Sequence, residues 1–85
     1  MKFEDRAVFG WPATPAAKAA CDKGLVIHYD GAKQPRGVAE WTHAQCRGYW
    51  KWCRTFHMNS NGWRDVGYSY GCCPHGTILE GRGWG

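Results

Sequence analysis

Two groups of side chains in this sequence could do chemistry, and the first is a histidine at the end of a predicted strand. His28 lies near the end of the short run Leu25–Tyr29, which is apolar on both faces. Such a run is typical of an interior strand in a parallel or mixed sheet. Because α/β sheets bind ligands beyond the carboxyl ends of their strands, His28 is placed where a functional group is expected. On its own, a strand histidine is more often a packed core or edge residue.

The second group could bind a metal. Cys53 and His57 are four residues apart, which places both on one face of a helix, and Cys72, Cys73 and His75 could complete a structural zinc site with them. The spacings match no standard zinc finger or zinc ribbon. The alternative is that the cysteines are small buried residues that pack beneath the helix.

The five cysteines are expected to be free thiols or metal ligands. An odd number leaves at least one unpaired in a monomer. Cys46 and Cys53 would be about 10 Å apart on one predicted helix, beyond the reach of a disulfide, and Cys72 and Cys73 point to opposite faces of a strand. The first residues alternate in charge and have no apolar core, unlike a signal peptide. We therefore expect cytoplasmic synthesis without a signal peptide, where thiols stay reduced.

An N-terminal arm and a short helix are expected before the predicted strand. Residues 1–13 show no clear periodicity, and Phe9 and Trp11 would pack this arm onto the body formed by residues 14–85. A threonine N-cap, a proline at the first helical position and several alanines predict a short N-terminal helix at about residues 15–23, which a glycine ends.

A long helix and a hairpin follow. Thr42 and Gln45 form a capping box, and the apolar residues after them recur at helical spacing, so the sequence predicts one helix over about residues 42–58. Residues 68–73 and 77–80 flank a proline-containing turn and alternate like strands, which predicts a β-hairpin. This order of elements predicts an α/β fold with a small mixed sheet covered by one long helix.

Composition narrows the class of protein. A chain of 85 residues forms one small domain of marginal stability. No apolar stretch is long enough to span a membrane, and we expect no membrane partner and no nucleic acid. The formal charge of +4 is scattered, so it could favour an anionic polymer such as a cell wall or serve only solubility. Six tryptophans are many for this length, and indole rings both fill cores and stack on sugars.

A longer pattern connects these features. The run FHMNSNGWRDVGYSY at residues 56–70, preceded by VIHY at 26–29 and followed by EGRGW at 80–84, resembles the zinc amidases and peptidoglycan recognition proteins. Their shared pattern is close to IHH…FHM…GW.DIGYNF…DG…YEGRGW, and the match covers roughly residues 25–84 in order. The resemblance implies an incomplete amidase or peptidoglycan-recognition fold, with the C-terminal half of the domain beyond Gly85.

The resemblance also implies roles for single residues. In the family the first histidine of IHH is a zinc ligand, which corresponds to His28, and the second is replaced here by Tyr29. Tyr68 corresponds to the catalytic tyrosine that lies beside the zinc-bound water and helps to stabilise the reacting centre. The alternative for Tyr68 is an ordinary packed strand tyrosine.

Three further residues correspond to the family's substrate-binding groove. Gly62, Trp63 and Arg82 match the Gly-Trp pair and the arginine that recognition proteins use to select diaminopimelate-type stem peptides. A guanidinium can grip the extra carboxylate of diaminopimelate with two hydrogen bonds. Without the resemblance, Arg82 would be a surface arginine and Trp63 a core aromatic residue.

The implied reaction needs a Zn2+ ion. In the resembled enzymes two histidines and a cysteine or aspartate hold the zinc, and the zinc-activated water cleaves the amide bond between N-acetylmuramic acid and L-alanine. The remaining ligands would lie outside this chain, so another chain or a second copy could complete the fold.

Three hypotheses follow. The first is part of a peptidoglycan hydrolase from a bacteriophage, an antimicrobial endolysin made without a signal peptide that degrades the cell wall after release. The second is a non-catalytic peptidoglycan-binding module or truncated relative. The third is a small structural zinc protein built on Cys53 and His57.

Overall fold

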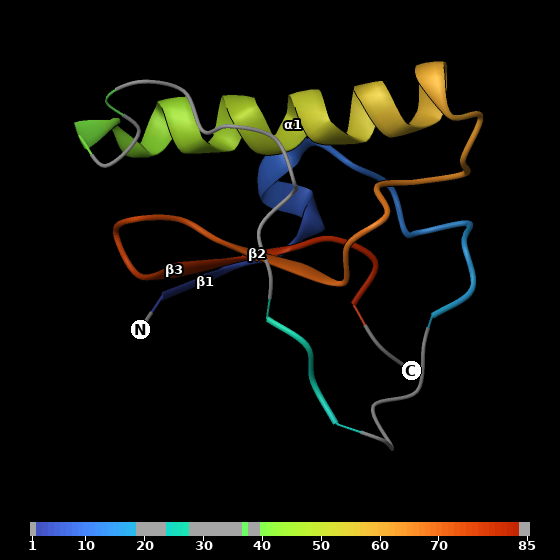
Figure 1. The fold of residues 1–85 in the computed structure, drawn as a ribbon, viewed down its shortest axis with the longest axis horizontal. Coiled ribbons are helices and arrows are strands. Elements are labelled where there is room, and N and C mark those ends of the chain that lie inside the picture. Colours follow the sequence, from blue (N-terminus) through green and yellow to red (C-terminus); the bar gives the residue numbers. More distant parts are fainter. Residues whose placement is uncertain (1, 19–23, 28–36, 38–39, 84–85) are drawn as a thin grey trace.

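The structure, a computed structural model, describes residues 2–18, 24–27, 37 and 40–83. Its elements are strand β1 (Lys2–Glu4), the 3-10 helix η1 (Arg6–Phe9), helix α1 (His43–Ser60) and strands β2 (Tyr70–Cys72) and β3 (Thr77–Glu80). Figure 1 shows α1 lying along one side of the three strands. The α/β fold with one long helix over a small mixed sheet is therefore confirmed.

β3 is the central strand of the sheet. β1 pairs with it in parallel and β2 pairs with it antiparallel, which makes the sheet mixed. Lys2 lies opposite Thr77, and Cys72 lies opposite Ile78. The sequence predicts the hairpin of β2 and β3 but not β1, because three residues are too few to show a period.

Helix α1 begins as the sequence predicts. The Thr42 hydroxyl accepts a hydrogen bond from the Gln45 N–H at 3.3 Å, and the Gln45 side chain accepts one from the Thr42 N–H at 2.8 Å, which completes the capping box. The helix ends at Ser60, two residues later than expected. Within the part of the chain that the structure describes, no helix has the length and apolar character needed to cross a membrane.

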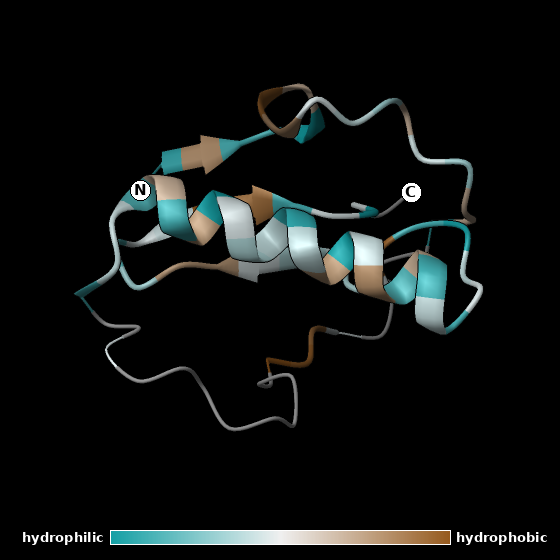
Figure 2. Ribbon diagram, turned by 90° about the horizontal axis from the view of Figure 1, so that it is seen from above, coloured by the Kyte–Doolittle hydropathy of each residue, from teal (hydrophilic) through white to brown (hydrophobic). Residues whose placement is uncertain are grey.

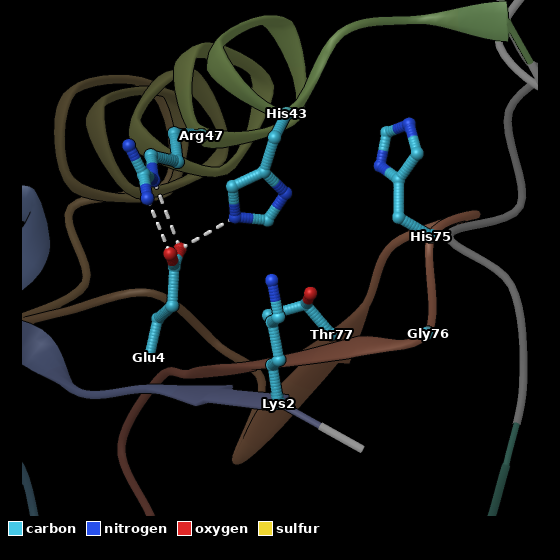
Figure 3. A pocket seen from close by; sticks show the side chains of 7 residues that line it. All are labelled: Lys2, Glu4, His43, Arg47, His75, Gly76 and Thr77. Carbon is cyan, nitrogen blue, oxygen red and sulfur yellow. Dashed lines mark hydrogen bonds and ion pairs between the residues drawn. The ribbon is translucent and has the colours of Figure 1, made fainter.

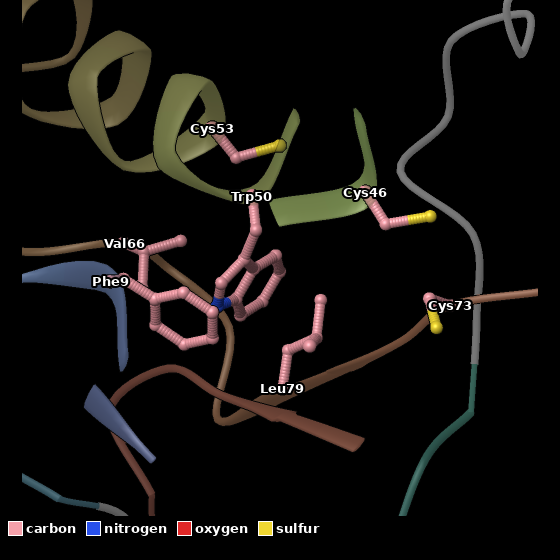
Figure 4. Close-up of a cluster of buried hydrophobic side chains, with 7 residues drawn as sticks. All are labelled: Phe9, Cys46, Trp50, Cys53, Val66, Cys73 and Leu79. Carbon is pink, nitrogen blue, oxygen red and sulfur yellow. The ribbon is translucent and has the colours of Figure 1, made fainter. Parts of the chain in front are cut away.

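The core lies between α1 and the sheet. Its buried side chains come from the arm, from α1, from the loop after it and from the hairpin, and they are Phe9, Cys46, Trp50, Cys53, Val66, Cys73 and Leu79 (Figure 4). Trp11 packs against this cluster, and its ring lies 5.0 Å from that of Phe9. The expected packing of Phe9 and Trp11 onto the body is confirmed. Three of the cysteines are small buried core residues, as one of the two alternatives predicts.

The predicted N-terminal helix does not form where the structure describes it. Residues 15–18 are not helical, and residues 19–23 lie outside the described residues. The Thr14 hydroxyl donates to the buried Asp65 carboxylate and accepts from the Ala16 N–H at 3.2 Å, so it stabilises a turn instead of a helix. A helix of about nine residues is also too short to be stable without a buried face.

The predicted strand at Leu25–Tyr29 is likewise not found in its described part. Leu25, Val26 and Ile27 have no strand structure and are 65%, 81% and 88% exposed. Figure 2 shows this stretch as a brown, apolar segment away from α1 and the sheet. The sheet takes its parallel strand from β1 instead, so the apolar run has no partner strand among the described residues.

A buried ion cluster joins distant parts of the chain. Asp65 is 0% exposed, and its two carboxylate oxygens accept hydrogen bonds at 2.8 Å from Arg6 Nη1 and Arg54 Nε. Arg6 also donates to the carbonyls of Pro12 and Gly81, at 2.7 and 2.8 Å. Through these contacts η1, α1 and the loop after β3 are held around one carboxylate.

Candidate functional site

The last turn of α1 brings the predicted site residues together. His57 lies near the C-terminal end of this helix, and its ring is 4.9 Å from that of Trp63 and 5.3 Å from that of Tyr68. Arg82 lies beside these residues, because its backbone N–H donates to the Tyr68 carbonyl at 2.9 Å. The sequence predicts Trp63, Tyr68 and Arg82 as site residues, and the structure places them in one patch around His57.

Gly62 and Trp63 are positioned by the end of the helix. Gly62 has φ of +70°, a left-handed conformation that glycine adopts readily, and the next N–H, of Trp63, donates to the His57 carbonyl at 3.1 Å. The Trp63 ring lies over Gly67, where an added Cβ would come within 2.6 Å of it. Trp63 remains 46% exposed, so part of its ring is open to a ligand and it is not a core residue.

The Arg82 side chain is held by a hydrogen bond at its Nε atom. Its Nε donates to the Val66 carbonyl at 2.7 Å, and the side chain is partly buried. Its two terminal nitrogens make no hydrogen bond or ion pair with any other described residue. A guanidinium held in this way presents two parallel donors, which suit a carboxylate.

Tyr68 is both packed and adjacent to the patch. Its ring stacks on Trp50 with centroids 6.1 Å apart and planes 17° apart, and its side chain is partly buried. The ring of Tyr68 therefore packs on Trp50 and also borders His57.

The sequence analysis assigns the wrong neighbours to one residue of this patch, His57. We expected it as a possible metal ligand with Cys53, but its Nδ1 accepts a hydrogen bond from the Gly67 N–H at 2.8 Å. The ligand atoms that lie together among the described residues are instead those of His43, Cys73 and His75, all within 4.8 Å of one another. The sequence feature that could have placed His57 in this patch is its position in the FHM segment of the resembled pattern.

A catalytic zinc ion does not fit the residues that the structure describes here. His28, the expected ligand, lies outside the described residues. The described histidines, cysteines and acidic residues form one group of three possible ligands, and it does not include Tyr68 or His57. We therefore derive no reaction step through zinc at this patch.

The environment of His57 makes a testable prediction about pH. Burial, and then the nearby positive charge of Arg82, lower the pKa of His57 below its ordinary value of 6.5. Because the pKa is lower in the folded chain, the unfolded chain binds more protons, so stability is complete above about pH 6.5 and decreases as the pH falls through the folded pKa. Protonation would also remove the acceptor that Nδ1 offers to Gly67.

We expect the midpoint of urea unfolding to decrease between pH 7 and pH 5, and to decrease less in His57→Gln. The three histidines that remain, His28, His43 and His75, are the same in both proteins. An equal pH dependence in the two proteins would contradict the prediction.

Three comparisons relate this fold and patch to known proteins. No protein-family model matches the sequence. Peptidoglycan-recognition protein SC1a of Drosophila melanogaster is 42% identical over 43 residues, which are 51% of this chain and 23% of that protein. N-acetylmuramoyl-L-alanine amidase of Sus scrofa is 39% identical over 41 residues, which are 48% of this chain and 7% of that protein.

The solved structure of bumblebee PGRP-SA has the same fold. It superposes with a TM-score of 0.75 and 27% identity over 98% of this chain and 48% of that chain. The fold thus defines an α/β protein of the peptidoglycan-recognition class. The chain is similar in sequence and in fold to peptidoglycan-recognition proteins and N-acetylmuramoyl-L-alanine amidases, at modest identity over part of its length. It spans about half the length of the bumblebee protein.

Proposed function

We propose that this chain contributes the peptide-binding part of a peptidoglycan amidase. The observation that carries the proposal is the guanidinium of Arg82, whose terminal nitrogens bind no other described residue, in the same patch around His57 as the half-exposed ring of Trp63. The names of the relatives support it, since the fly proteins are peptidoglycan-recognition proteins and the pig protein is an N-acetylmuramoyl-L-alanine amidase.

The described residues would bind and orient the stem peptide. Arg82 would hold a carboxylate with its two terminal nitrogens, and the diaminopimelate side chain offers one that lysine-type peptides lack. The Trp63 ring would pack on the apolar and sugar surfaces of the substrate. Tyr68 would lie beside the bond to be cleaved, between N-acetylmuramic acid and L-alanine.

The second part of the proposal is that the complete protein hydrolyses peptidoglycan. In this part, His28 would hold a Zn2+ ion together with ligands from the remainder of a complete amidase, which could be another chain or a second copy. A metal ion held in such a complete enzyme would supply Lewis-acid chemistry for amide hydrolysis. An endolysin of phage type, released onto the cell wall, is the kind of protein that fits this reaction.

Binding to purified walls tests the role of Arg82. Arg82→Lys keeps the positive charge but loses the two parallel N–H donors of the guanidinium. We expect it to weaken binding to diaminopimelate-type peptidoglycan about tenfold, since a charge-assisted hydrogen bond contributes about 1.5–3 kcal/mol. Binding to lysine-type peptidoglycan should change little. Arg64→Ala is the matched control, because it removes an exposed arginine beside Trp63. Equal loss in the control, or equal loss on both wall types, would count against the proposal.

A binding module without hydrolysis is the second candidate. It is favoured by the absence, among residues 2–18, 24–27, 37 and 40–83, of three possible metal ligands next to Tyr68. Incubating the chain on peptidoglycan with zinc or with chelator, and measuring newly freed L-alanine amino groups, separates the two. Release that is lost in His28→Ala supports the amidase, whereas wall binding without release by folded protein supports the binding module.

A further inference from the structure

Three possible metal ligands, His43, Cys73 and His75, lie within 4.8 Å of one another at the end of α1 opposite to His57, and Cys46 lies beside them. His43 and Cys46 lie in the first turn of α1, and Cys73 and His75 lie in the turn between β2 and β3. The Cys73 Sγ is 3.8 Å from His43 Nδ1 and 3.5 Å from His75 Nδ1, and the Cys46 Sγ is 3.8 Å from His75 Nδ1. Fourteen helical residues, about 21 Å, separate this group from the patch around His57.

We propose that His43, Cys46, Cys73 and His75 bind one structural zinc ion. Two cysteine sulfurs and two histidine nitrogens are a common ligand set for a closed, four-coordinate zinc site. With zinc–sulfur bonds of about 2.3 Å and zinc–nitrogen bonds of about 2.0–2.1 Å, tetrahedral ligands lie about 3.5 Å apart. Three of the six separations within this set, Cys73 to His43, Cys73 to His75 and Cys46 to His75, are 3.5–3.8 Å and close to that spacing.

The hydrogen bonds on the far side of both rings favour metal ligands. His43 Nε2 lies 2.9 Å from Glu4 Oε1 (Figure 3), and His75 Nε2 lies 2.5 Å from the Trp41 carbonyl oxygen. A carbonyl can only accept, so His75 carries its proton on Nε2 and its Nδ1 lone pair faces the two sulfurs. A carboxylate or carbonyl behind each histidine is the usual arrangement around bound zinc.

The electrostatics of the group are also suitable. Burial raises the pKa of Cys73, but hydrogen bonds with Thr77 and His75 outweigh it and lower the pKa to about 6, so the thiolate is available at neutral pH. Burial, and then the neighbouring Cys73, raise the pKa of Cys46. The second thiol would therefore lose its proton when the ion binds.

The position of the group explains why it would stabilise the fold. The ion would tie the start of α1 to the tip of the hairpin, and Cys46 and Cys73 are core residues that are 5% and 9% exposed. A pocket of about 460 Å3, lined in part by His43 and His75, opens beside the group and gives an ion a path to it (Figure 3). Small domains with little core often depend on such a metal.

Metal content of the full chain, purified under reducing conditions, tests the proposal. We expect one zinc ion per chain, and X-ray absorption at the zinc edge should show two sulfur and two nitrogen ligands. Cobalt in place of zinc should give visible bands of tetrahedral type and a thiolate charge-transfer band. Cys46→Ser should halve that band, and His75→Gln should weaken metal binding at least tenfold.

Control variants separate this site from the others in the chain. Cys53→Ser removes a buried thiol from the same helix, and Cys72→Ser removes the exposed thiol beside Cys73. Zinc content should be unchanged in both. The proposal is overturned if the folded wild-type chain binds no zinc, if the absorption spectrum lacks two sulfur ligands, or if Cys46 and Cys73 form a disulfide under the same conditions.

Discussion

Asp65→Ala is expected to lower the free energy of unfolding by about 3–5 kcal/mol, which would unfold much of a domain of this size. The substitution leaves Arg6 and Arg54 without their shared carboxylate, and Arg6 is 7% exposed, so its charge would stay buried without a counter-charge. It also removes an acceptor from the Val66 N–H, which now donates to Asp65 at 2.9 Å.

Urea unfolding followed by tryptophan fluorescence measures this effect. Glu40→Ala is the matched control, because it removes an exposed carboxylate, and we expect it to change the unfolding free energy by less than about 0.5 kcal/mol. The loss of unfolding free energy in Asp65→Asn should lie between the losses in these two variants, since asparagine keeps the shape and one acceptor but loses the charge. A loss below about 1 kcal/mol in Asp65→Ala would show that the ion cluster contributes little.

The same carboxylate should make the fold sensitive to acid. Burial alone would raise the pKa of Asp65, but hydrogen bonds from Thr14, Arg54, Val66 and Arg6 together lower it below its ordinary value of 3.8. A lowered folded pKa means that the stabilisation is present above about pH 3.8 and is lost as the pH falls through the folded value.

Trp50→Ala is the second substitution with a large expected effect, a loss of about 3–5 kcal/mol in unfolding free energy. Trp50 is 6% exposed, and its ring fills the space above Gly71, where an added Cβ would lie 2.8 Å from it. Its Nε1 donates to the Glu80 carbonyl at 3.0 Å, so the change removes a hydrogen bond as well as core volume.

Trp52→Ala provides the comparison on the same helix. Trp52 is 54% exposed, and its loss should cost less than about 1 kcal/mol. Thermal unfolding followed by circular dichroism, which does not depend on either indole alone, compares the two variants. Similar midpoints for both would mean that the core between α1 and the sheet is not the main source of stability.

The elements that the sequence predicts well are those with a strong local signal. Thr42 and Gln45 define the start of α1, and the turn after Cys73 defines the hairpin. The run at Leu25–Ile27 has a strand-like composition. Whether it pairs depends on a free position beside a strand, and β1 and β2 occupy both positions beside β3. Strand pairing of this run depends on the tertiary structure, so the apolar pattern of the sequence alone could not predict it.

The two candidate sites differ in how far the sequence could predict them. Trp63 and Arg82 come from a resemblance in which order and spacing are shared, and the structure brings them together at His57. For the proposed metal site, the sequence analysis names two of the same residues, Cys73 and His75, but pairs them with Cys53 and His57. Helix α1 carries two such pairs, and only the packing of its first turn on the hairpin selects His43 and Cys46.

The pairing of β1 with β3 has a consequence for how the chain folds. Lys2 meets Thr77, 75 positions later, so the central strand acquires its parallel neighbour only when almost the whole described chain is available. Contacts between such distant segments carry a large loop-closure cost and slow the search for the native state. During synthesis the sheet would therefore be completed last, after α1 has had time to form.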